Sequence, residues 1–219
     1  MKSTFLIITS IFIMSFAGIA TAQDLHDFVD LGLPSGTLWA TCNVGANNPE
    51  DYGDYFAWGE TTTKSNYDWS TLKYCLDNEG YEYSKYNTKS QYGSVDNQKD
   101  LEQSDDAATA NWGSNWCMPT PAQFQELKDK CEWTWSTKNG KNGYEVKGPN
   151  DNTIFLPAAG SRNGASLNGV GSDGYYWSSS LLTNNPQGGH RLYFYWFDVL
   201  PDGWGYRCYG FSVRPVLCR

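Results

Sequence analysis

The sequence has few basic residues, only two histidines and no long apolar run beyond its first 22 residues. It contains 16 Lys and Arg and 24 Asp and Glu, which gives a net charge of −8 over 219 residues. A nucleic-acid-binding protein needs a basic face for the phosphates, and a polybasic membrane anchor needs a cluster of Lys and Arg. The composition therefore predicts no nucleic-acid partner and, after residue 22, no transmembrane segment.

The sequence also lacks the motifs of common hydrolases and redox enzymes. It contains no CxxC pair, which argues against a zinc site or a redox dithiol. The serines at 178–180 have no nucleophile-elbow motif around them, and only His26 and His190 are available as bases. We expect these serines to satisfy backbone groups at the end of a strand. We predict no catalytic residue.

Acidic residues occur in pairs that suggest two further kinds of chemistry. A glycosidase uses two carboxyl groups across a cleft, and the chain offers Asp105 with Asp106 and Asp51 with Asp54. Helix capping explains Asp105 and Asp106 more simply. Calcium is a weaker alternative at residues 51–54 and 150–152, which place oxygen ligands in turns. Turn formation without a metal is the commoner reason for such residues, so we predict no cofactor.

The first 22 residues have the features of a secretory signal peptide. Lys2 precedes an apolar stretch, and Ala20 and Ala22 are small residues at the positions that signal peptidase reads. We predict cleavage before Gln23 and a protein that is secreted or held in the cell envelope, in the periplasm or at the cell surface.

Export changes the interpretation of the cysteines. An oxidising compartment and an even number of cysteines favour one or more disulfides. The six are Cys42, Cys75, Cys117, Cys131, Cys208 and Cys218. Sequence does not choose among the pairings, although Cys208 and Cys218 lie close enough along the chain to pair. Buried free thiols are the alternative for any of them.

The chain after residue 22 predicts an α+β fold with short antiparallel strands, long loops and one clear helix, since 22 Gly and 9 Pro leave little room for long helices. A capping box at Thr120 and Gln123, followed by apolar residues at helical spacing, predicts a helix over residues 121–131. A shorter helix is expected near Asp105. Residues 61–106 are rich in Tyr and polar residues without periodicity, which predicts a loop-rich insertion that packs on the core or is functional.

Alternation and turn patterns predict the strands. They are expected at 29–31, 37–40, 143–146, 153–156, 175–177, 191–199 and 209–216. The sequence Pro201-Asp202-Gly203 predicts a turn after the strand at 191–199. Pro215 near the end of the last strand favours an edge position for it.

Five short segments follow one another along nearly the whole mature chain. They are 29–40 (VDLGLPSGTLWA), 116–120 (WCMPT), 154–160 (IFLPAAG), 176–180 (YWSSS) and 210–216 (GFSVRPV). In this order they resemble the Fibrobacter succinogenes major paralogous domain family of secreted bacterial proteins. That family is similar to the formylglycine-generating-enzyme-like branch of the C-type-lectin fold. The resemblance therefore implies a single C-type-lectin-like domain over residues 23–219, with its termini close together.

The resemblance does not carry over the activity of formylglycine-generating enzymes. Those enzymes hold copper with two nearby cysteines ahead of the closing strand, and here only Cys208 lies close before that strand. Some members of the fold are diversified adhesins, whose variable residues lie in the part that corresponds to residues 181–209. The resemblance thus implies that this segment can form a recognition surface.

The same segment is rich in aromatic residues beside charged ones. Tyr and Trp offer large, rigid contact areas and are common in binding surfaces. The predicted ligand-binding residues are Tyr193, Tyr195, Trp196, Asp198, Asp202, Trp204, Tyr206, Arg207 and Tyr209. Seven other tryptophans are expected in the core: Trp39, Trp58, Trp112, Trp116, Trp133, Trp135 and Trp177.

These observations predict an exported, non-enzymatic binding or adhesion module that recognises an extracellular protein or a glycan. Two alternatives remain open at this point. One is a structural protein of the cell envelope in which all the aromatic residues are core. The other is an exported enzyme of unknown reaction on the same fold, which would need a pocket holding titratable groups with shifted pKa values.

Overall fold

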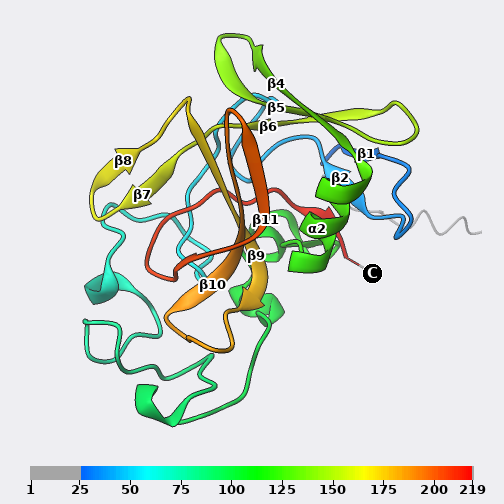
Figure 1. Cartoon of the computed structure of the whole chain (residues 1–219). Helices are drawn as coiled ribbons and strands as arrows, with labels where there is room; N and C mark the ends of the chain where they lie inside the picture. The colour runs from blue at the N-terminus through cyan, green and yellow to red at the C-terminus, as the bar shows by residue number, and fades with distance from the viewer. Residues whose placement is uncertain (1–25, 219) are drawn as a thin grey trace, which may run out of the picture.

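The computed structural model of the chain describes residues 26–218 (Figure 1). The predicted signal peptide, residues 1–22, lies outside the described residues. Within them the chain combines two α-helices with short strands in several antiparallel sheets, as predicted for an α+β protein. No helix among the described residues is long and apolar enough to cross a membrane.

The first sheet joins the two ends of the described chain. Its strand order is β1 (Phe28–Asp30), β2 (Leu38–Ala40), β12 (Val216–Leu217) and β3 (Trp116–Cys117). Val216 pairs with Trp39 on one side and with Cys117 on the other. The prediction of a last strand over residues 209–216 at an edge is therefore wrong: of that range only Val216 lies in a strand, and this strand is internal. Pro215 is tolerated because it precedes the ladder and contributes only its carbonyl, which accepts a hydrogen bond from the Ala40 N–H.

The two helices begin where the capping residues predicted. Helix α2 (Pro121–Lys130) has a capping box in which Thr120 and Gln123 satisfy each other's backbone N–H groups. Its Phe124 and Leu127 are buried against the core. Helix α1 (Ala107–Trp112) is capped by Asp106, whose carboxylate accepts from the Thr109 N–H at 3.0 Å. Both helix predictions are confirmed.

A second sheet follows helix α2 directly. It consists of β4 (Glu132–Lys138), β5 (Lys141–Lys147) and β6 (Thr153–Pro157), in that order. The β5–β6 hairpin was predicted, whereas β4 was not. Strand β4 carries Trp133 and Trp135, which pack edge-on against Tyr144. A short two-stranded sheet, β7 (Ser161–Asn163) with β8 (Ser166–Asn168), comes next along the chain.

The third large sheet is a meander of β9 (Asp173–Leu181), β10 (Gly188–Tyr195) and β11 (Asp198–Tyr206), with β10 in the middle. The hairpin turn lies at Trp196 and Phe197, since Tyr195 pairs with Asp198. The predicted turn at residues 201–203 is therefore wrong, and so is the predicted extent of the strand before it. Pro201 lies instead within edge strand β11, opposite a register shift in β10 between Arg191 and Tyr193. A proline is compatible with an edge strand at a bulge because its missing N–H leaves no ladder bond unmade.

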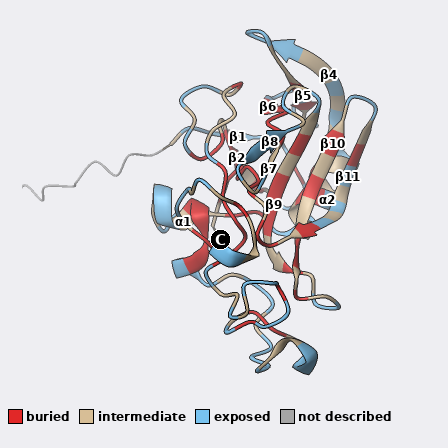
Figure 2. Cartoon of the chain, turned by 90° about the vertical axis from the view of Figure 1, so that its left-hand side faces the viewer, coloured by how far each residue is buried: buried red, intermediate tan, exposed pale blue. Residues whose placement is uncertain are grey.

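Most of the expected core tryptophans are in the core. Trp39, Trp58, Trp116 and Trp177 are fully buried. The other three expected there, Trp112, Trp133 and Trp135, are partly buried and pack against it. Figure 2 shows buried positions alternating with partly exposed ones along β9 and β10. This alternation gives the meander one face toward the core and helix α2, and one face outward.

One disulfide joins Cys117 of β3 to Cys218, just after β12. The suggested pairing of Cys208 with Cys218 is wrong. Cys208 is a buried free thiol in a different apolar cluster, with Tyr67 and Tyr83 of the segment 61–106. Burial in that cluster raises the pKa of the Cys208 thiol to about 12.

Residues 61–106 contain three short 3-10 helices, at Trp69–Thr71, Ser90–Tyr92 and Gln103–Asp105, joined by loops. They occupy the lower end of the molecule in Figure 1, drawn in cyan to green. Tyr67, Leu72, Tyr83 and Tyr86 of this segment are buried. The segment thus packs on the core through tyrosine side chains rather than through regular secondary structure.

Candidate functional site

The outer face of the β9–β10–β11 meander carries a row of aromatic side chains. Along β10, Leu192 and Phe194 point into the core, which turns Tyr193 and Tyr195 outward. The ring centroids of Tyr193 and Tyr195 lie 5.6 Å apart, and Phe197 in the turn lies 4.5 Å from Tyr195. The row therefore runs from the middle of the sheet to the tip of the β10–β11 hairpin.

The tip and the second strand of this hairpin expose large apolar side chains to solvent. Trp196 is 66% exposed, Phe197 61%, Trp204 45% and Leu200 43%. These four exposed apolar side chains all belong to one two-stranded element. Patches of this kind on a soluble protein mark sites of interaction.

Aromatic residues at the end of β11 contact the segment 61–106. Trp204 packs against Tyr206, and Tyr206 packs against Tyr209, with ring centroids 5.5 and 5.6 Å apart. Trp69 lies 5.5 Å from Tyr206, edge to face. The loop-rich segment thus fixes one side of the aromatic surface.

A cavity of about 280 Å³ opens between these rings. We call it the Arg191 pocket; it is bounded by Ser161, Tyr175, Arg191, Trp204, Gly205, Tyr206, Tyr209 and Phe211. Gly205 is required there, because a Cβ at this position would lie 2.6 Å from the Phe211 ring. Three of the predicted ligand-binding residues, Trp204, Tyr206 and Tyr209, line the pocket.

The two predicted acidic residues lie on the hairpin but contact other groups. Asp198 caps the turn by accepting a hydrogen bond from the Val199 N–H at 2.8 Å. Asp202 is mostly exposed, and its carboxylate lies 3.0 Å from Nδ1 of His190. Both carboxylates remain at the surface of the hairpin.

Arg207 does not reach this surface. It is fully buried, and its guanidinium donates to the backbone carbonyls of Lys85, Tyr86 and Pro186. Its carbon Cζ also lies 4.6 Å from the centre of the Tyr83 ring. Burial lowers the pKa of Arg207 to about 10. Its contacts tie the end of β11 to the segment 61–106.

Sequence reasoning missed four members of the surface. Phe197 was placed in a strand rather than at the tip, and Leu200, Tyr175 and Arg191 were not assigned to the site. Tyr175 and Arg191 are brought to the site by the pairing of β9 with β10, in which Tyr193 lies opposite Tyr175. That pairing is not readable from the local sequence.

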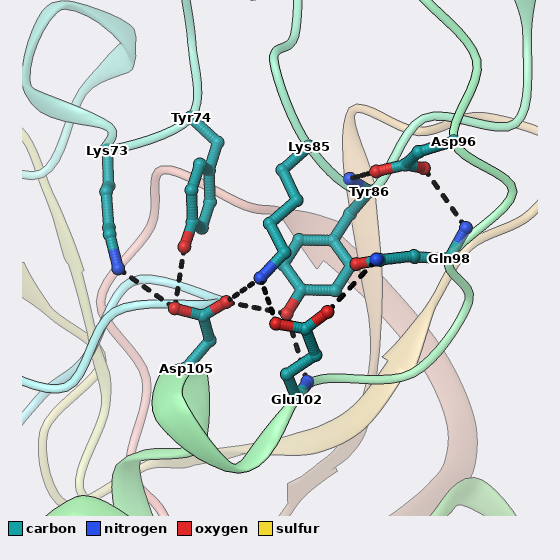
Figure 3. Close-up of polar contacts among 8 residues, drawn as sticks. All are labelled: Lys73, Tyr74, Lys85, Tyr86, Asp96, Gln98, Glu102 and Asp105. Atoms are coloured by element: carbon teal, nitrogen blue, oxygen red, sulfur yellow. Dashed lines mark hydrogen bonds and ion pairs between the residues drawn. The ribbon is translucent and has the colours of Figure 1, made fainter.

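The carboxylate of Asp105 joins two lysines and two tyrosines of the segment 61–106 (Figure 3). Its Oδ1 accepts hydrogen bonds from Lys73 Nζ at 2.9 Å and the Tyr74 hydroxyl at 2.6 Å. Its Oδ2 accepts from Lys85 Nζ at 2.6 Å and the Tyr86 hydroxyl at 2.7 Å. Burial alone would raise the pKa of Asp105, but these four donors together lower it well below its usual range. A carboxylate held in this way is a structural anion and not a general acid or base.

The other candidates for chemistry are also engaged in structural contacts. Asp106 caps helix α1 and accepts from the Met118 N–H at 2.8 Å. Ser178 donates its hydroxyl to the backbone carbonyl of His190, not to an imidazole. Asp51 accepts from Lys141 Nζ at 2.6 Å and from Asn48, which lower its pKa to about 2. Asp151 pairs with Lys147 at 2.6 Å.

Within residues 26–218, no three His, Cys, Asp or Glu side chains gather closely enough to hold a metal ion. The chain matches no model of a known protein family, no curated protein and no solved structure.

Proposed function

We propose that this protein is an exported, non-enzymatic binding module that recognises a protein or a glycan through the β10–β11 hairpin. The observation that carries the proposal is the exposure of Trp196, Phe197, Leu200 and Trp204 on one hairpin. Exposing them to water is unfavourable unless a partner covers them, because each buried apolar side chain is worth roughly 1.5–3 kcal/mol.

The anchoring of the hairpin in the core supports a role in recognition. Leu192 and Phe194 anchor β10 in the core, while the two turn residues at its tip, Trp196 and Phe197, are mostly exposed. Rigid aromatic side chains on an anchored hairpin lose little conformational entropy on binding. The disulfide between Cys117 and Cys218 supports the proposed export, since such bonds persist in oxidising compartments.

We assign the fold to the C-type-lectin-like class as part of the same proposal. The segments that carry the resemblance to the Fibrobacter succinogenes major paralogous domain family fall at β1–β2, before α2, in β6, in β9 and just before β12. The first and last strands, β1 and β12, lie in one sheet with only β2 between them, which supports the close approach of the two ends of the described chain. A recognition surface on β10–β11 then corresponds to the variable part of the diversified adhesins.

The test is a binding screen of the purified protein on glycan and cell-surface-protein arrays with two triple variants. The first carries Trp196→Ala, Trp204→Ala and Tyr206→Ala. The second, a matched control, carries Leu76→Ala, Tyr81→Ala and Val95→Ala, which remove three exposed apolar side chains from the segment 61–106.

We expect the wild type and the control to bind the same targets and the hairpin variant to lose them while keeping its melting transition. Binding that survives in the hairpin variant but is lost in the control would move the site to the segment 61–106. Absence of any target for the wild type would contradict the proposal as well.

A further inference from the structure

The Arg191 pocket holds a guanidinium without a carboxylate partner. Arg191 Cζ lies 4.9 Å from the ring centre of Tyr175, 4.8 Å from that of Tyr193 and 5.7 Å from that of Phe211. Its Nε donates to the Trp204 carbonyl at 2.7 Å. Its Nη1 is buried and makes no hydrogen bond with any group of residues 26–218.

The acidic residues near this guanidinium are engaged elsewhere. Asp173 accepts a hydrogen bond from the Tyr193 hydroxyl at 2.9 Å, and Asp202 lies against His190. Among the described residues, no Asp or Glu lines the pocket or lies within 4.0 Å of Arg191. Burial lowers the pKa of Arg191, but a guanidinium stays charged at neutral pH. A largely buried charge with three aromatic neighbours and no counter-ion is stabilised by any anion that enters.

The aromatic walls of the pocket indicate what kind of group would carry the anion. Trp204, Tyr206 and Tyr209 surround the opening with aromatic rings. Such rings provide flat apolar faces with a polar group at one end, which suits the C–H face and hydroxyl rim of a pyranose. An acidic side chain of a protein would bring only one or two methylene groups to these walls.

We propose that the Arg191 pocket binds a carboxylated sugar, such as a uronic or sialic acid residue of a glycan. The guanidinium of Arg191 pairs with the sugar carboxylate, and the rings of Trp204 and Tyr206 pack on the pyranose. This inference rests on the proposed function, since it names the ligand class of the same surface.

Binding of free sugars to the purified protein tests the assignment. The probes are D-glucuronate and N-acetylneuraminate, with D-glucose and acetate as the neutral-sugar and bare-carboxylate controls. Affinity is followed by NMR through the shift of the Trp204 indole N–H. We expect at least one acidic sugar to bind roughly tenfold to a hundredfold more tightly than either control, as for hydrogen bonds to a charged group. Equal binding of glucose or acetate, or no shift with either acidic sugar, would overturn the inference.

Two variants separate charge from aromatic packing. Arg191→Gln should lose at least about tenfold in affinity for the acidic sugar. Arg162→Gln, whose guanidinium lies over Tyr55 in a different cavity, should lose none. Trp204→Ala should weaken the binding of the acidic sugar but leave the binding of acetate unchanged. Because the Trp204 side chain is half exposed, this variant should fold and can be used if Arg191→Gln does not.

The array targets distinguish this inference from the proposed function. Suppose that the hairpin triple variant loses its target, while Arg191→Gln keeps it and acidic sugars do not compete. The pocket assignment is then wrong and the proposed function stands. If acidic sugars bind at Trp204 but the hairpin variant keeps its array targets, the pocket assignment stands and the proposed function is wrong.

Discussion

At the scale of single residues, Asp105 has the largest expected effect on stability. Its buried carboxylate accepts from two lysines and two tyrosines that come from separate loops of the segment 61–106. Asp105→Asn removes the charge and leaves Lys85 and Lys73 without this partner. Breaking a buried ion pair costs roughly 3–5 kcal/mol. We expect a loss of this size in urea unfolding at pH 7.

The pH dependence of Asp105 supplies an independent readout. Its pKa is lower in the folded state than in the unfolded chain, so its contribution is fully present above the unfolded value of about 3.9 and is lost as pH falls toward the folded one. The difference in free energy of unfolding between the wild type and Asp105→Asn should therefore become smaller below about pH 4. Glu79→Gln removes an exposed negative charge from the same segment and should change stability by less than about 0.5 kcal/mol. A difference that is constant with pH would contradict the role given to Asp105.

At the scale of elements, the sequence predicted those helices and turns whose formation depends on residues close together in the chain. The capping box predicted α2, and the polar turn at residues 148–152 predicted the β5–β6 hairpin, because both depend on neighbours in sequence. The β10–β11 turn was misplaced because Trp196 and Phe197 carry no turn signal, whereas Pro201 and Gly203 do. In the structure Gly203 pairs with Arg191, and Pro201 lies at the register shift beside it, so both residues belong to an edge strand. Only the pairing across strands reveals this.

The packing of β9 against β10 makes a prediction at this same scale. A Cβ added at Gly174 of β9 would lie 2.1 Å from Cζ of Phe194 in β10. Gly174→Ala should therefore cost roughly 1–3 kcal/mol through overpacking. In a Phe194→Leu background the ring is gone, so the same substitution should cost less, with a coupling of about 0.5 kcal/mol or more. Additive effects in this double-mutant cycle, measured by urea unfolding, would show that the ring does not require the glycine.

At the scale of the whole molecule, the sequence predicted the class of fold but not its long-range connections. The α+β class follows from one capped helix, short alternating strands and abundant glycine. The insertion of β12 between β2 and β3, the partners of Asp105 and the closure of the Arg191 pocket each join residues far apart in the chain. The sequence places the aromatic residues of the candidate site on one segment, but only the three-strand meander decides which of them point outward.

The disulfide between Cys117 and Cys218 closes a loop with a sequence separation of 101 residues and links β3 to the residue that follows its partner strand β12. Cys218→Ser should lower the free energy of unfolding by roughly 2–5 kcal/mol, because a long closed loop restricts the unfolded chain. Cys42→Ser, which changes an unpaired thiol, should cost less than about 1 kcal/mol. The unreduced protein, unfolded in denaturant, should titrate as four free thiols: Cys42, Cys75, Cys131 and Cys208. Six thiols after purification from an oxidising compartment would contradict the disulfide and weaken the proposal of export, whereas two would indicate a second bridge among the remaining cysteines.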